Sequence, residues 1–146
     1  LMRASLPSTI EINLDIADDC GVVVADPTNI HQIIMNLCTN AYHAMEKTGG
    51  RLGVTLSRVE SMPEDVVGTD RDVGPYLCLK VEDTGHGIEK EVMDRIFDPY
   101  YTTKEKGKGT GLGLAVVHGI VHSYGEAIRV QSEIGVGTVF QLFCRP

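Results

Sequence analysis

The stretch YLCLKVEDTGHG, from Tyr76 to Gly87, is the part of the sequence that most constrains the fold. Its first residues are mainly apolar and predict a strand that ends at Asp83. Gly85 and Gly87 follow, and glycines beside a carboxylate let the backbone close on a flat ligand. A carboxylate accepts hydrogen bonds, so Asp83 is a candidate partner for a purine amino group. The alternatives are a simple turn, or an aspartic protease, which needs two such carboxylates where this chain has one Asp-Thr-Gly.

A second glycine-rich stretch, GKGTGLGL from Gly107 to Leu114, leads into a predicted helix that runs from Gly111 to Tyr124. Free N–H groups at a helix N-terminus bind anions, with help from the helix dipole. Added positive charge comes from Lys104, Lys106 and Lys108. The pattern therefore predicts a triphosphate site, although its spacing is neither that of a Walker A loop nor that of a Rossmann fingerprint. A flexible hinge would explain the glycines but not the lysines.

A third pattern lies on the helix predicted from Pro27 to about Lys47, which Asp26 would cap and Gly49 and Gly50 would end. At 100° per residue, Asn36, Asn40 and His43 fall within an arc of roughly 60° beside an apolar sector. Side-chain amide oxygens suit a hard cation such as Mg²⁺. Ordinary solvated asparagines on an amphipathic helix are the alternative.

The rest of the chain reads as strands, one short helix and one irregular loop. The predicted strands are Ile10–Ile16, Gly21–Asp26, Arg51–Glu60, Tyr76–Asp83, Ala127–Ser132 and Val136–Phe143, the last two a hairpin around Gly135. A short helix is expected over Glu89–Ile96, and a loop over Phe97–Thr110. Two long helices with about six strands predict an α/β sandwich, with helices on one face of a mixed sheet.

The length, charge and cysteine content of the chain exclude several classes of protein. A chain of 146 residues fits one domain, and its net charge of −7 disfavours nucleic acid and anionic lipid as partners. It contains no apolar run of about 18 residues. The four cysteines include no C-x-x-C pair, and Cys38 and Cys78 lie in apolar patterns typical of core residues. Reduced thiols and no visible signal peptide predict a cytoplasmic protein. Because the chain opens at Leu1, we expect it to be part of a longer protein.

The order of the motifs is more specific than any one of them. They are NLCTNA (36–41), DTGHG (83–87), IFDPYYTTK (96–104), GKGTGLGL (107–114) and GVGT (135–138). This order resembles the N, G1, F and G2 boxes of Bergerat-fold ATPases, in the version found in sensor histidine kinases, from about Ile10 to Phe143. The resemblance implies a single domain over residues 1–146. It also implies a two-layer sandwich, in which a mixed, mainly antiparallel sheet of five or more strands packs on about three helices.

The resemblance also implies roles for individual residues. Asn40, with Asn36, would hold Mg²⁺ on the phosphates of ATP. Asp83 would accept from the adenine amino group, with Thr138 supporting the carboxylate or its water. Phe97 would anchor an ATP lid over about residues 97–110. The catalytic set would be Asn36, Asn40 and Lys104. Other nucleotide-binding positions would be His43, Ala44, Gly85, Gly87, Ile88, Lys108, Gly109, Thr110, Gly111, Leu112 and Gly113.

Three positions depart from the common pattern of the family. His43 stands where many members carry Lys or Arg, Ala44 where many carry a stacking aromatic residue, and Glu126 where a second glycine is common. We therefore expect weaker charge neutralisation at the phosphates and reduced stacking on the base. The departure at Glu126 affects only a local turn.

The implied activity is transfer of the γ-phosphoryl group of ATP to a histidine on a separate dimerisation domain, for relay to a response regulator. That acceptor domain is not expected in this chain, since none of its five histidines is followed by an acidic residue and an arginine. Relatives that hydrolyse ATP place a Glu base at the position of Asn36, and an amide cannot take a proton from water. We therefore expect little hydrolysis, and no direct contact with membrane. A serine kinase of the anti-sigma-factor type, or a degenerate partner-binding module, remains an alternative.

Overall fold

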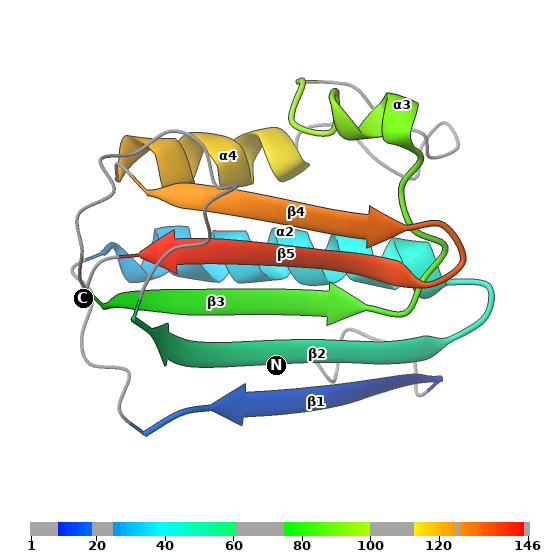
Figure 1. Cartoon of the computed structure of the whole chain (residues 1–146), viewed down its shortest axis with the longest axis horizontal. Helices are drawn as coiled ribbons and strands as arrows, with labels where there is room; N and C mark the ends of the chain where they lie inside the picture. Colours follow the sequence, from blue (N-terminus) through cyan, green and yellow to red (C-terminus); the bar gives the residue numbers. More distant parts are fainter. Residues whose placement is uncertain (1–8, 19–24, 61–74, 100–112, 125, 145–146) are drawn as a thin grey trace.

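The structure, a computed structural model, describes residues 9–18, 25–60, 75–99, 113–124 and 126–144 (Figure 1). This part of the chain forms five strands and three helices. The strands are β1 (Ile10–Ile16), β2 (Gly50–Val59), β3 (Tyr76–Asp83), β4 (Ala127–Glu133) and β5 (Gly137–Cys144). The helices are α2 (Pro27–Met45), α3 (Lys90–Met93) and α4 (Gly113–Ser123). The predicted strand over Gly21–Asp26 falls mostly on residues outside the described ranges.

The five strands form one sheet in the order β1-β2-β3-β5-β4. β1 runs parallel to β2, and the other three neighbouring pairs are antiparallel. The prediction of a mixed, mainly antiparallel sheet is therefore confirmed. β3 lies in the middle of the sheet, so its last residue, Asp83, has a strand on either side: Leu52 of β2 and Thr138 of β5 are its partners.

Helices α2 and α4 lie on the same face of the sheet, as Figure 1 shows, and the main core fills the space between the two layers. α2 contributes apolar side chains at the spacing of one helix face, and the strands contribute alternate residues. The core includes Ile33, Leu37, Ala41, Met45, Leu52, Val81, Val117, Phe140 and Leu142. Burial of each large apolar side chain stabilises the fold by about 1.5–3 kcal/mol, so this layer fixes where α2 sits.

The start of α2 is held by hydrogen bonds from two directions. The Asp26 side chain caps the helix by accepting from the Thr28 amide at 2.8 Å, as the sequence predicted. The Tyr124 hydroxyl, just beyond α4, accepts from the Asp26 amide at 3.1 Å and from Asn29 Nδ2 at 3.0 Å. The two long helices are thus tied together at this end.

The predicted end of α2 at about Lys47 is two residues too long. The helix ends at Met45, and residues 46–48 form a turn. Gly49 adopts a φ of 70° and donates its N–H to the Met45 carbonyl at 2.7 Å. A left-handed glycine whose N–H bonds to one of the last helix carbonyls commonly ends a helix. Because Gly49 bonds to Met45, the helix ends there and Lys47 lies in the turn that follows.

Other boundaries differ slightly from prediction. α3 covers four residues instead of Glu89–Ile96, because the chain continues as a turn in which the Asp98 amide donates to the Arg95 carbonyl. α4 is described from Gly113 onward, and its predicted start at Gly111 lies outside the described residues. The hairpin of β4 and β5 turns at Gly135, which has a φ of 80°. None of the helices described here is long and apolar enough to cross a membrane.

Cys38 and Cys78 are buried and free, which confirms their prediction as small core residues. Burial raises the pKa of the Cys38 thiol to about 11, so this thiol stays protonated and unreactive at neutral pH.

Candidate nucleotide-binding site

The side chain of Asp83 is buried at the end of the central strand, with 9% of the residue exposed. It accepts a hydrogen bond from the Gly85 amide at 2.9 Å and another from the Thr138 backbone amide. A carboxylate has about four lone-pair sites, so two such bonds leave capacity for a further donor. Asp83 is therefore a fixed, buried acceptor at the end of β3, where the sequence predicted the strand to end.

Burial raises the pKa of the Asp83 carboxyl above its ordinary value of 3.8, because removal from water disfavours the charged form. The two backbone donors and the nearby His86 act in the opposite direction and favour the carboxylate. A buried acidic side chain held by backbone amides, without a salt-bridge partner among the described residues, is characteristic of a binding position rather than a structural ion pair.

The loop after Asp83 lies directly against the last turn of α2. A Cβ at Gly85 would come within 2.6 Å of both the Ala44 Cβ and the Ala44 carbonyl oxygen, so only glycine fits. The next residue, His86, donates its N–H to that carbonyl at 3.2 Å. Ala44, which the sequence marked as a departure from the aromatic residue of many relatives, is thus in contact with the glycine loop.

The turn between β4 and β5 closes the other side of this loop. Gly87 has a φ of 80°, and a Cβ there would collide with the Glu133 carbonyl. Gly137 has a φ of 147°, and a Cβ there would collide with the Asp83 carbonyl. The Gly135 amide donates to the His86 carbonyl at 3.0 Å. Glycines from both segments therefore let two backbones approach at the end of the sheet where Asp83 sits.

The family resemblance implied that Thr138 supports the Asp83 carboxylate or its water, without saying which atom of Thr138 does so. Its backbone amide, not its hydroxyl, supports Asp83, while the hydroxyl pairs with Ser132 Oγ at 2.8 Å. Ser132 also accepts from the Ile88 amide at 2.8 Å and donates to the Gly137 carbonyl at 3.1 Å. Ser132 was missed altogether, because its partners are set by the register of β4 on β5, which no local pattern reveals.

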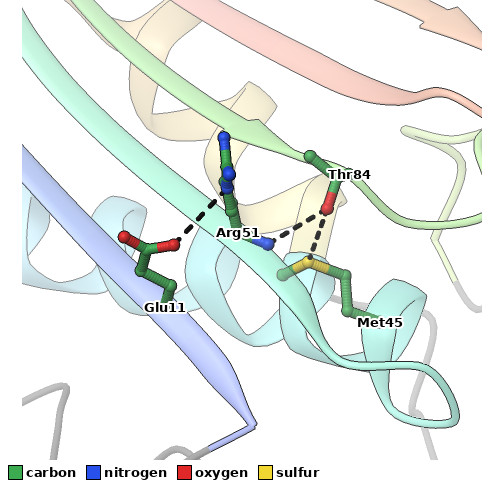
Figure 2. A network of polar contacts seen from close by, with 4 residues as sticks. All are labelled: Glu11, Met45, Arg51 and Thr84. Carbon is green, nitrogen blue, oxygen red and sulfur yellow. Dashed lines mark hydrogen bonds and ion pairs between the residues drawn. The ribbon is translucent and has the colours of Figure 1, made fainter.

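A network around Thr84 fixes the end of β3 relative to β2 and α2. Figure 2 shows the Thr84 hydroxyl between the Arg51 amide, which donates to it at 3.0 Å, and the Met45 sulfur, which accepts from it at 3.8 Å. The Arg51 guanidinium also pairs with Glu11 of β1 at 3.4 Å. That ion pair is well exposed and contributes little. The two bonds of Thr84 are the ones that locate the strand end beside Asp83.

The polar edge of α2 leads away from Asp83 toward α4. Asn36 Nδ2 donates to the Gly113 carbonyl at the start of α4, at 3.2 Å, which leaves the amide oxygen of Asn36 available as a ligand. Asn40 lies one turn further along, and it and His43 are half-buried. Ala44 is eight positions after Asn36, which corresponds to about 12 Å along the helix. One side of α2 thus joins the buried acceptor to the N-terminal end of α4.

Phe97, predicted to anchor a lid, packs against the main core. The centroid of its ring lies 5.0 Å from the centroid of the His118 ring on α4. Ile88 also packs on the core. The remaining predicted site residues lie outside the described ranges. They are Lys104, Lys108, Gly109, Thr110, Gly111 and Leu112.

The donor set on α2 fits Mg²⁺ better than a transition metal. The described residues contain no group of three or more His, Cys, Asp and Glu side chains that could hold a metal ion. Amide oxygens from Asn36 and Asn40 are hard ligands, and Mg²⁺ typically takes few protein ligands, together with substrate phosphates and water.

Residues 25–146 match the family described as histidine kinase-, DNA gyrase B- and HSP90-like ATPases. Over 144 residues the chain is 39% identical to the sensor kinase CckA of Brucella abortus, covering 98% of this chain and 15% of that protein. It is 40% identical over 121 residues to the sensor histidine kinase ZraS of Salmonella typhi, covering 83% of this chain and 23% of that protein. The chain therefore spans less than a quarter of the length of these relatives.

The fold is similar to that of ShkA, whose full-length structure was solved in complex with AMPPNP. The TM-score is 0.72 and the sequence identity 27%, with 92% of this chain and 25% of that chain covered. The family match spans the buried Asp83, the glycine loop and the polar edge of α2. The chain belongs to the histidine kinase-, DNA gyrase B- and HSP90-like ATPase family, in the form of the ATP-binding catalytic domain of sensor histidine kinases.

Proposed function

We propose that this chain binds ATP with Mg²⁺ along α2, with adenine at Asp83 and the phosphates near Asn36, Asn40 and the start of α4. The observation that carries the proposal is the buried Asp83 carboxylate. It is held by the Gly85 and Thr138 amides beside two glycines that leave no room for side chains. A purine amino group is a donor of the size and polarity that this acceptor can take.

At the other end, Asn36 is held by the Gly113 carbonyl, and its amide oxygen together with that of Asn40 would hold Mg²⁺. The metal would neutralise charge on the phosphates. Since neither amide can act as a general base, we propose that the domain hydrolyses ATP slowly. The predicted lid, from Phe97 to about Thr110, with Lys104 and Lys108, would cover the phosphates.

The proposed reaction of the parent protein is transfer of the γ-phosphoryl group to a histidine on a separate helical dimerisation domain, followed by relay to a response regulator. Sensor kinases such as CckA and ZraS, of which this chain matches a minor part, support this proposal. Use of ATP as donor and the free buried thiols of Cys38 and Cys78 support action in the cytoplasm.

Calorimetric titration with AMPPNP, with and without Mg²⁺, tests the proposal. The Asp83→Asn variant should lose at least tenfold in affinity, because it places an amide where the acceptor is needed. Asp15→Asn is the matched control, since Asp15 is an exposed carboxylate on β1. Asn40→Ala should weaken binding only when Mg²⁺ is present. Equal affinities of Asp83→Asn and the wild type would refute the assignment of the base site.

A further inference from the structure

Two histidines on the outer face of α4 form a pair that the nucleotide site does not use. His118 and His122 are four residues apart, so they lie one turn apart on the same side of the helix. Both are exposed. Their ring centroids are 6.2 Å apart, and the ring planes differ by only 4°. The two imidazoles are thus already side by side and parallel.

The surroundings restrict one member of the pair. The ring of Phe97 lies 5.0 Å from that of His118, at an interplanar angle of 33°, and Phe97 is itself packed on the main core. His118 is therefore in ring contact with a core-anchored aromatic residue as well as with His122. A side chain that is already restricted loses less conformational entropy when it binds a ligand.

Imidazole nitrogen is a common ligand of divalent transition metals. Two histidines at positions i and i+4 of a helix are the arrangement by which helical metalloprotease motifs hold zinc. Because each Zn–N bond is about 2.0–2.1 Å, two imidazole nitrogens on one tetrahedral zinc lie about 3.3 Å apart. Rotation of the exposed His122 side chain between staggered conformations can bring its ring closer to His118.

We propose that His118 and His122 form a two-histidine chelate for a divalent transition metal such as Ni²⁺ or Zn²⁺, on the face of α4 that bears these two rings. Within the described residues no third His, Cys, Asp or Glu joins them in a group, so water completes the coordination. Mg²⁺ does not compete, because it prefers oxygen ligands. The site is separate from the Asn36 and Asn40 amides and does not depend on nucleotide.

Titration of the whole chain with NiCl₂ or ZnCl₂, without nucleotide and in excess Mg²⁺, tests this proposal. Heat and imidazole ¹⁵N shifts report binding. One ion per chain is expected, and His118→Ala and His122→Ala should each weaken binding at least tenfold. Ni²⁺ should bind more tightly than Mn²⁺, as expected for nitrogen ligands. Circular dichroism confirms that the variants, altered at exposed positions, remain folded.

His31→Ala is the matched control. His31 is an exposed histidine on α2, but the residues four positions before and after it are Pro27 and Met35, so it cannot chelate with a neighbouring turn. The His31→Ala variant should bind the metal with the same affinity as the wild type. Absence of saturable binding by the wild-type chain, or binding that survives both α4 substitutions, would overturn the proposal.

Discussion

The Asp83 carboxyl group lies at a buried position, where its charged form is disfavoured. Its pKa is raised in the folded protein above the ordinary 3.8, so protonation of this group favours folding. That contribution is fully present below the unfolded pKa and is lost as the pH rises through the folded pKa. In Asp83→Asn the position does not titrate. The melting temperature of Asp83→Asn relative to wild type should therefore rise with pH through the acid range and level off toward neutrality.

Thermal melts in a pH series check this prediction, with the exposed Asp15→Asn variant as control. A relative melting temperature that falls as pH rises would mean that the amides of Gly85 and Thr138 outweigh the burial of Asp83. The expected sign would show that ionised Asp83 lowers stability, as is common for residues with the binding role proposed here.

The contact between Gly85 and Ala44 leads to a second prediction at the residue scale. Gly85→Ala places a Cβ within 2.6 Å of Ala44 and should destabilise the fold by about 1–3 kcal/mol, as overpacking does. Gly119→Ala is the control, because a Cβ there meets nothing within 4 Å in the middle of α4. That change should stabilise the protein by about 0.5–1 kcal/mol. Urea unfolding measures the change in the free energy of unfolding for both variants. Equal changes in the two variants would contradict the close approach of Gly85 to Ala44.

Between elements, the Tyr124 hydroxyl ties α4 to the start of α2 through Asp26 and Asn29. Tyr124→Phe keeps the ring and removes the acceptor of both bonds. Because a typical hydrogen bond contributes about 0.5–1.5 kcal/mol and this site is partly exposed, the loss should be about 1 kcal/mol. The urea midpoint should fall without a change in slope. A midpoint equal to that of wild type would show that water replaces both bonds.

The sequence predicted most elements because their signals are local. Asp26 and Pro27 mark the start of α2. Alternating apolar and polar residues mark β1, and a mainly apolar stretch marks β3, both with the bounds that the structure shows. Boundaries set by a distant or competing contact were less accurate. The end of α2 depends on how early the left-handed Gly49 returns to Met45, and α3 is shorter because a turn through Arg95 and Asp98 replaces its last residues.

For the whole molecule, binding and stability are linked. If AMPPNP binds only the folded chain, a concentration one hundred times the dissociation constant should add about 2.7 kcal/mol to the free energy of unfolding. For a domain of this size that corresponds to a rise in melting temperature of about 5–10 °C. Scanning calorimetry at several AMPPNP concentrations checks the logarithmic dependence. At the same AMPPNP concentration the rise in Asp83→Asn should be about half of the wild-type rise or less, as a loss of at least tenfold in affinity requires, and a rise of the same size there would place the nucleotide elsewhere.

At this scale the sequence named candidate residues that the structure brings together at the end of β3, but it did not predict the contacts between them. Asp83, Gly85 and Gly87 were named because glycines and carboxylates after strands are visible in a linear pattern, and Thr138 was named from the family resemblance. Three further contacts depend on which strands are neighbours. They are the bond from the Thr138 amide to Asp83, the pairing of the Ser132 and Thr138 hydroxyls, and the close approach of Gly137 to the Asp83 carbonyl. Strand order is a property of the complete fold, so these contacts became visible only in three dimensions.

The backbone bonds from the His86 amide to the Ala44 carbonyl and from the Gly135 amide to the His86 carbonyl have a consequence for motion. They join three segments that are each more than 40 positions apart in the sequence, so neither bond can open without separating distant parts of the chain. Native-state hydrogen–deuterium exchange should find the amides of His86 and Gly135 among the slowly exchanging ones, although both residues lie at the surface. The base end of the site would then open with the protein as a whole, and entry of a ligand would have to rely on other segments.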